Sequence, residues 1–490
     1  MIFIVFDCGG RFRYLLQVRE PMARSWNRSW PALLALLLAL APFSNIQASD
    51  DDLTVVGMDV TVELRPEQGL ISETARLTLQ GSSGPVVRFR LNRGLQVERS
   101  RAGSGSIRHS QTGDTVSVTL IPPLQDEQRT ITLELAGRPR AHGDDRVNGN
   151  GAVLGGVDHW IPTLPRTAAV ARREVVAPPH WVVLASGEPQ PAGKAGTHRF
   201  RSRRPVRSLG LAAGPALVRT DASIARTPLR VAGSGDQVAE ELAPLFSDPL
   251  TWLSGTVAPY PFEGVNLAFV PGLERTVHAG GFIAVPADRP VNGKADGGEL
   301  LSPLWFGEYL AGDGPWMDGL AAWQAVTYAL DRGQGMPARI GSLRDRYLSM
   351  SQNRDVAIRR ADRETPEAVV RGKGSAAWEM VRAACGNRHF RDRLDELAAT
   401  GLGGPVRLED LRSRFAAGTS EPVEAVFEDW FDRTGLPALT TELNTVPTSR
   451  DEWRTDLSIR QQGKPYTLAL EVVFHGAGQI HRETVRIDRE

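Results

Sequence analysis

The sequence predicts an α+β protein of several domains, and three observations along its 490 residues support this class. Residues 52 to 220 alternate apolar and polar side chains, which is the period of half-buried strands. After "GSGDQ" the apolar residues take helical spacing, and from 446 onward strand-like alternation returns. We therefore expect a β-rich N-terminal domain (49–220), an α/β plus helical domain (221–445) and a short C-terminal β segment (446–490).

The predicted strands of the first domain are separated by turn-forming residues. Segments such as "LTVVGMDVTVELRPEQG" and "ISETARLTLQG" alternate apolar with polar residues, and Gly, Pro and Asp stand between the runs. This pattern is typical of an antiparallel sandwich or saddle.

The second domain begins with a helix in "VAEELAPLFSDPLTWLSGTV", followed by short apolar strands in "GVNLAFVPG" and "GGFIAVPAD". Helices are then predicted at 299–311, 315–332, 338–350, 375–385, 389–399 and 421–434. The C-terminal segment holds about three strands, which are too few to bury a core alone. We expect it to pair with another domain or a partner.

The N-terminus has the order of a secretory signal peptide. From Met22, two arginines precede the apolar run from Pro31 to Phe43, and small residues then lead to a predicted cleavage site after Ala48. Residues 1–48 are therefore predicted to be a signal peptide, with 1–21 an upstream extension. The expected location is periplasmic or secreted. The alternative is an uncleaved membrane anchor, although the run is shorter than the roughly 20 residues of a spanning helix.

The composition excludes several functions. Lys+Arg and Asp+Glu number 57 each, and no run of like charge indicates a nucleic-acid surface or a polyanion site. The two cysteines, Cys8 and Cys385, cannot form a cysteine-based zinc site. No Gly-x-Ser-x-Gly elbow is present to indicate a serine hydrolase.

Five segments of the chain, taken in order, resemble the aminopeptidase N family of zinc peptidases, the gluzincins. They are "APYPFEGVNLAFVPGLERTVHAGGFIAVPADRP" (258–290), "ELLSPLWFG" (299–307), "PWMDGLAAW" (315–323), "RGKGSAAWEMVRAACGNRHF" (371–390) and "FEDWFDRTGLPAL" (427–439). The resemblance implies a thermolysin-like fold for the second domain. It also implies a zinc site with two histidines and a glutamate.

The residues at the implied zinc positions depart from the family. When Trp305 is aligned with the family's zinc helix, the two histidine positions fall on Glu299 and Pro303. The general-base position falls on Leu300, and the third-ligand position falls on Asp318. A catalytic zinc needs three protein ligands and one open position. Pro303 also disturbs a helix interior, so we expect the helix either to start near Ser302 or to be kinked.

Two further family positions are also changed. The tyrosine that donates a proton falls on Arg371, and the edge strand that clamps the substrate's amino group reads His278-Ala279-Gly280-Gly281-Phe282. The glutamate of that strand is therefore missing. His278, Gly280, Gly281 and Trp305 are the residues that we expect to line the old cleft.

These substitutions predict a protein without cofactors that is catalytically inactive and binds or scaffolds in the cell envelope. Its expected partner is a protein or peptide there; no nucleic acid is expected, and a membrane only if the signal segment is uncleaved. The alternative is an active metallopeptidase, or another hydrolase, with a non-standard site near Glu299, Asp318 and His278; zinc enters only under this alternative. A third class is a structural subunit whose cleft is filled by its own side chains.

Overall fold

The computed structural model divides the chain into two compact units, residues 48–435 and residues 1–47 together with 436–490. The described residues are 3–8, 53–140, 145–155, 159–164, 166–333, 343, 345–350, 354–362, 365–401, 405–419, 422–447, 453–476 and 479–487. The expected signal segment and its cleavage site lie outside them, apart from one short strand at 3–8.

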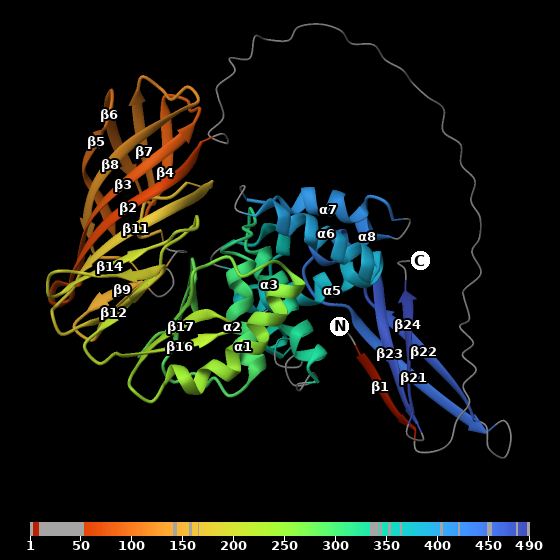
Figure 1. Cartoon of the computed structure of the whole chain (residues 1–490). Coiled ribbons are helices and arrows are strands. Elements are labelled where there is room, and N and C mark those ends of the chain that lie inside the picture. The colour runs from red at the N-terminus through yellow and green to blue at the C-terminus, as the bar shows by residue number, and fades with distance from the viewer. Residues whose placement is uncertain are drawn as a thin grey trace, which may run out of the picture. The chain divides into compact units, whose positions relative to one another are not determined.

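A seven-stranded sheet dominates the first half of the larger unit (Figure 1), with the strand order β13-β14-β11-β2-β3-β8-β5. Its strands are β2 (Thr54–Arg65), β3 (Leu70–Gly81), β5 (Leu95–Ala102), β8 (Glu127–Gly137), β11 (Thr167–Val176), β13 (Glu188–Gln190) and β14 (Thr197–Arg201). A 3-10 turn, η2 (Pro66–Gln68), joins β2 to β3. Burial alternates along β2 and β3, so one face packs inward and the other meets solvent, as the sequence predicted.

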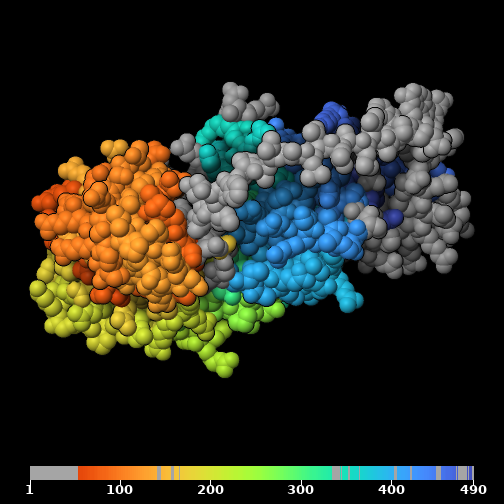
Figure 2. Space-filling view, turned by 90° about the horizontal axis from the view of Figure 1, so that it is seen from above, coloured from red at the N-terminus to blue at the C-terminus, as the bar shows by residue number. Residues whose placement is uncertain are grey.

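Two smaller sheets complete this β-rich region, which forms one closely packed lobe in Figure 2. One has the order β4-β7-β6 and consists of β4 (Val86–Arg90), β6 (Ser106–Thr112) and β7 (Thr115–Ile121). The other has the order β12-β15-β10-β9 and consists of β9 (Arg146–Asn148), β10 (Gly151–Leu154), β12 (Val182–Ala185) and β15 (Leu211–Gly214). The edge strand β5 is protected by Gln111, whose side chain bonds Val97 N at 3.1 Å and Leu95 O at 2.7 Å.

A five-stranded mixed sheet carries one side of the site, with the order β16-β17-β18-β20-β19. Its strands are β16 (Val218–Ile224), β17 (Thr227–Gly233), β18 (Val265–Val270), β19 (Val277–Ala279) and β20 (Phe282–Pro286). Helix α1 (Ala239–Thr256) connects β17 to β18. β17, β18 and β20 run parallel, and every residue of β18 is buried, as expected for a strand covered on both faces. The expected boundary at 220 falls within β16.

Helices form the rest of the larger unit (Figure 1). They are α2 (Lys294–Trp305), α3 (Trp316–Asp331), the 3-10 turn η4 (Ile358–Arg360), the π-helix η5 (Ala368–Lys373), α5 (Gly374–Cys385), α6 (Asn387–Thr400), α7 (Leu408–Ala416) and α8 (Val423–Trp430). Trp378 is fully buried and its ring lies 5.2–6.1 Å from those of Trp316, Phe415, Phe427 and Phe431. Of the predicted helix at 338–350, residues 343 and 345–350 are described, and 343 and 345–348 among them are helical; α7 was not predicted.

Of the two alternatives expected for the helix around Pro303, a start near Ser302 was wrong, and a kink stays a prediction. α2 begins at Lys294 and includes Pro303 two residues before its end. Pro303 cannot donate a hydrogen bond to the carbonyl of Glu299. Only the last turn is affected, because the eight helical residues before Ser302 are held by the packing of Leu300 and Leu301, which are 1% and 0% exposed.

The smaller unit contains two sheets. β21 (Ala438–Pro447) pairs with β22 (Trp453–Gln462), and the second sheet has the order β1-β23-β24. Its strands are β1 (Phe3–Cys8), β23 (Leu468–Gly476) and β24 (Gln479–Ile487), with β1 parallel to β23. The three strands expected after 446 are present, and β21 lies before them. Among the described residues, no helix is long and apolar enough to cross a membrane.

Candidate functional site

Glu299 occupies the first implied ligand position and lies on α2 with 24% of its side chain exposed. Its Oε1 accepts hydrogen bonds from two guanidinium groups, Nη2 of Arg289 at 3.1 Å and Nη2 of Arg371 at 3.3 Å. Arg289 follows β20 and also donates to Thr276 at 2.9 Å. The carboxylate therefore sits between two cations that come from different parts of the domain.

Arg371, at the implied tyrosine position, lies on the π-helix η5 and is only 14% exposed. Its Nη1 donates to Glu367 at 2.9 Å, one helical turn earlier. η5 approaches α3 closely because Gly319 of α3 faces Val370 of η5 and Gly374, the residue that follows η5 and begins α5. A Cβ added to Gly319 would lie 2.9 Å from the Cα of Gly374. This contact brings Arg371 beside the N-terminal turn of α3.

Asp318, the implied third ligand, lies on that first turn of α3. Burial raises the pKa of its carboxyl to about 6; the nearby charge of Arg371 lowers the pKa and that of Glu367 raises it. The alignment with the family therefore brought Glu299, Asp318 and Arg371 into one electrostatic neighbourhood. Among these three residues, Arg371 is the one that interacts with both others: its guanidinium bonds to Glu299, and its charge lowers the pKa of Asp318.

His278 lies on the edge strand β19 and faces α2 through a hydrogen bond of its Nε2 to Leu300 O at 3.0 Å. Because a carbonyl only accepts, Nε2 carries the proton. Burial lowers the pKa of the imidazole to about 4, the bond to Leu300 raises it, and Arg371 and Arg289 lower it. His278 is therefore neutral at pH 7, and its Nε2 is committed to α2.

The residues at the implied metal positions do not fit a zinc ion. The side chain of Pro303, at a ligand position, offers no donor atom, and one oxygen of Glu299 already accepts from two arginines. A dication beside Arg289 and Arg371 would meet the repulsion of both guanidiniums. Within the described ranges, no group of three or more His, Cys, Asp or Glu side chains is arranged to hold a metal.

The edge strand next to His278 cannot carry the family's glutamate. Gly281, at the glutamate position, has a φ of 75°, and a Cβ there would lie 2.9 Å from Phe262 Cβ and 3.0 Å from Gly264 O. A Cβ at Gly280 would lie 2.8 Å from Ser208 O. The turn of Gly280 and Gly281, between β19 and β20, is pressed against its neighbours, so only glycine fits.

Trp305 was expected at the cleft, but the structure places it in the interior. It is 0% exposed, and its Nε1 donates to Ala258 O at 2.8 Å. Its ring packs edge-to-face on Tyr260, with 5.2 Å between centroids. Trp305 therefore anchors the end of α2 to the loop after α1.

Glu308 is an ionisable group that the sequence did not single out. Its Oε2 accepts from Ser208 Oγ at 2.5 Å and from Gly280 N at 3.0 Å. Burial raises its pKa to about 7, against the lowering effect of these two hydrogen bonds and Arg207; Asp318 raises it further. It ties the turn after α2 to the edge strand. In the sequence, only its position directly after the "WFG" segment could have indicated that Glu308 lies near the site.

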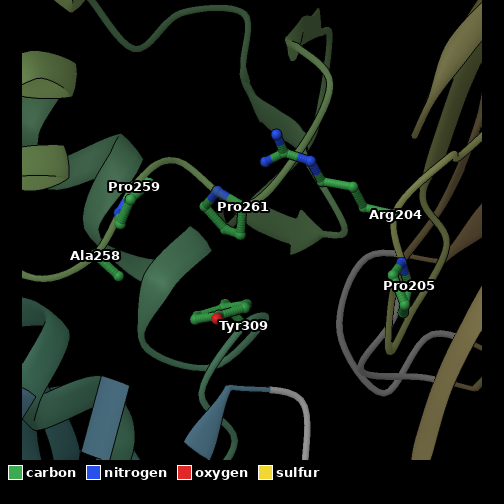
Figure 3. A pocket seen from close by; sticks show the side chains of 6 residues that line it. All are labelled: Arg204, Pro205, Ala258, Pro259, Pro261 and Tyr309. Carbon is green, nitrogen blue, oxygen red and sulfur yellow. The ribbon is translucent and has the colours of Figure 1, made fainter. Parts of the chain in front are cut away.

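Two cavities lie near these elements. One, of about 430 Å³, includes Arg289 in its wall, together with residues after β17 and β20. The other, of about 400 Å³, is lined by Arg204, Pro205, Ala258, Pro259, Pro261 and Tyr309. Figure 3 shows the ring of Tyr309 on the side opposite Pro261, with the Arg204 guanidinium above. Neither wall includes Glu299, Asp318 or His278.

The fold is that of M1 zinc metallopeptidases, the class to which aminopeptidase N belongs. The M1 zinc metallopeptidase from Deinococcus radiodurans matches with a TM-score of 0.67 and 22% identity over 79% of this chain and 95% of that chain. A glutamate-to-alanine mutant of this protein has a TM-score of 0.68, and the same mutant bound to a Tyr-Ser-Ala substrate has 0.66. Each of the two is 22% identical over 79% of this chain and 96% of that chain.

These matches confirm the predicted likeness to that fold, with its β-rich N-terminal region and its helical region. No protein-family model matches the chain, and no curated protein matches it in sequence. At this identity the likeness establishes the fold, and function has to be argued from the side chains.

Proposed function

We propose that this chain is a catalytically silent relative of the gluzincin peptidases, with a thermolysin-like second domain, that acts by binding a protein or peptide in the cell envelope. The observation that carries the proposal is the pair of guanidiniums from Arg289 and Arg371 on one oxygen of Glu299. The ion network occupies the position where the family resemblance implies a metal. The envelope location rests on the signal-like order of residues 22–48.

The groups around this network are poorly suited to hydrolysis. A general base must reach the proton it removes and have a pKa near the working pH. Leu300 stands at the base position, and His278 has a pKa lowered to about 4 and donates to that residue's carbonyl. The guanidinium of an arginine, the group that Arg371 places at the tyrosine position, is a poor proton donor. The fold is nevertheless one that holds peptides, because a mutant M1 peptidase with this architecture is described with Tyr-Ser-Ala bound.

Metal content and peptidase activity of residues 49–490 test the proposal. After exposure to zinc and desalting, we expect less than about a tenth of a zinc per chain, since a tight structural or catalytic site retains its ion. We also expect no release of amino acids from tripeptides. An active M1 peptidase treated in parallel controls the assay. Near-stoichiometric zinc that disappears in E299A or D318A, with peptide cleavage, would overturn the proposal.

A second function, a hydrolase with a non-standard site, is favoured by one observation. Asp318 and Glu308 have pKa values raised to about 6 and about 7, and the charge of Asp318 contributes to raising the pKa of Glu308. Paired carboxyls with separated pKa values near neutrality are suited to acid and base roles. If this function is present, zinc-free protein cleaves a peptide or ester substrate, and D318N and E308Q each abolish the cleavage. If wild type, D318N and E308Q all cleave the substrate only at the background rate, this second function is rejected.

A further inference from the structure

The exposed face of the seven-stranded sheet carries a row of residues that crosses every strand, and six of its seven members are charged. Direct cross-strand pairing connects the row through each neighbouring pair of strands. From β13 to β5 its members are Glu188, Arg201, Arg172, Asp59, Arg76, Thr132 and Arg101. We call this set the arginine row. Seven strands about 4.8 Å apart give it a length of roughly 29 Å.

The arginine row is positively charged, although the chain as a whole is neutral. It holds four arginines against two carboxylates, a net charge of +2. Arg76, Arg172 and Arg201 are exposed, and none of the three forms an ion pair or hydrogen bond through its side chain within the described part of the chain. Arg101 is paired with Glu134 at 3.3 Å.

The neighbouring row, two residues along each strand, is electrically balanced. It consists of Gln190, Arg199, Glu174, Thr61, Thr74, Glu134 and Arg99. Arg199 pairs with Glu174 at 2.8 Å, and Arg99 lies 3.8 Å from Glu134. The excess charge of this face is therefore concentrated in the arginine row.

Arg172 and Arg201 lie directly opposite each other in an antiparallel pair. Side chains at such positions have Cβ atoms about 4.5–5.5 Å apart, and like charges there repel. An anionic group between the two guanidiniums would replace that repulsion by two attractions. Guanidinium binds carboxylate with two parallel hydrogen bonds, which suits an exposed pair of this kind.

The charge density and chemistry of the face favour one class of anion. Duplex DNA carries one negative charge per about 1.7 Å, far denser than a row with three unpaired arginines in roughly 29 Å. The two rows contain no aromatic or large aliphatic side chain to enter a bilayer. They do contain Thr61, Thr74 and Thr132, which can hydrogen-bond to sugar hydroxyls. A linear glycan with spaced carboxylates matches the flat face and the sparse charge.

We propose that the arginine row is a docking surface for a linear, carboxylate-bearing polysaccharide. This surface is separate from the Glu299 network, and its existence does not depend on whether the chain hydrolyses peptides. The sequence showed no run of basic residues because the row is assembled from segments that run from residue 59 to residue 201.

The test measures binding of fluorescently labelled oligogalacturonate to residues 49–490 by anisotropy at low and at moderate salt. The variants are R172E/R201E and, as a control, R108E, which makes one such charge reversal on an exposed arginine of β6, half the charge change of the double variant. Thermal melts verify that each variant is folded. Labelled duplex DNA and vesicles containing anionic phospholipid are the comparison probes.

We expect wild type to bind oligogalacturonate, with an affinity that falls as salt rises. R172E/R201E should bind at least tenfold more weakly, and R108E should remain within twofold of wild type. Absence of binding at low salt would overturn the proposal. An equal loss of binding in R108E would show that the effect depends only on the net charge of the protein, and would reject the proposal. Tighter binding of DNA or of vesicles than of oligogalacturonate would assign the arginine row to that other partner, and would also reject the proposal.

Discussion

The carboxylate of Glu299 and the guanidinium of Arg371 meet at 3.3 Å although they are 72 positions apart in the chain. Glu299 comes from α2 and Arg371 from the π-helix η5. Their contact fixes the spacing of the two helical segments around α3. It also places the guanidinium of Arg371 next to Glu299, the residue at the first implied ligand position. The stability of the domain and the absence of hydrolysis proposed here therefore depend on the same pair.

Removing Arg371 should destabilise the protein. With 14% and 24% of the two side chains exposed, the pair lies between the surface and the buried case. We expect R371Q to lower the free energy of unfolding by about 1–2 kcal/mol in urea titrations. E299Q should cost a similar amount, and R371Q/E299Q less than the sum of the two, since one interaction is lost. Strict additivity in this cycle would show that the pair contributes nothing.

Replacing Glu73 should stabilise the protein at neutral pH. Glu73 is 3% exposed on β3, and neither carboxyl oxygen has a hydrogen-bond partner within the described residues. Burial raises its pKa well above 4.5, so the folded state keeps the proton that the unfolded state releases. Stability is therefore lost as pH rises above about 4.5.

The variant E73L removes this titration and fills the same space with an apolar side chain. We expect it to raise the free energy of unfolding at pH 7 by about 1–3 kcal/mol, because an unsatisfied buried group is removed. The gain should be smaller at pH 4, where both states of the wild type are protonated. A variant that is less stable than wild type at pH 7 would indicate an ionic partner for Glu73.

Glu308 should also contribute a pH dependence, one that begins near pH 4.5 and ends near pH 7. Its pKa is raised from 4.5 to about 7, so the folded state retains its proton over a range in which the unfolded state has lost it. The wild type should lose stability between pH 4.5 and 7, and this contribution should level off above pH 7. E308Q should flatten the slope in that interval while leaving the contribution of Asp318 in place. Urea titrations at pH 4.5, 6 and 8 measure the difference, and identical slopes would contradict it.

Much of the architecture could be predicted from the sequence because period and burial agree along most elements. β2 and β3 alternate in sequence and in exposure, and β18 is a continuous apolar run. α7 was missed, although its buried Leu408, Leu411 and Phe415 have helical spacing. Its short length and many charges obscured that signal.

The site was only partly predictable. The family alignment placed Glu299, Asp318 and Arg371 in one neighbourhood, and the contacts of the three agree with that placement. Arg289 and Glu308 could not be foreseen, because their partners are set by how separate segments pack. Ser208 lies 100 positions from Glu308, and no spacing rule links the two.

The close approach of α3 and η5 gives the last prediction. A Cβ at Gly319 would lie 2.7 Å from Val370 O and 2.9 Å from Gly374 Cα, so G319A must push the two segments apart. We expect a loss of about 1–3 kcal/mol in the free energy of unfolding, as for other overpacked sites. The separation should also move Arg371 away from Asp318, which removes an interaction that lowers the carboxyl's pKa. The pKa of Asp318, followed by NMR, should therefore rise above about 6.

The matched control is G255A, in the last turn of α1, where a Cβ has nothing within 4 Å. Alanine is the better helix former by about 1 kcal/mol in helix interiors, so G255A should be neutral or slightly stabilising. The two substitutions add the same methyl group to helical glycines, and only the surroundings differ. If G319A were as stable as G255A, the segments would be able to separate without cost. The Glu299–Arg371 contact could then not depend on a fixed crossing of α3 and η5.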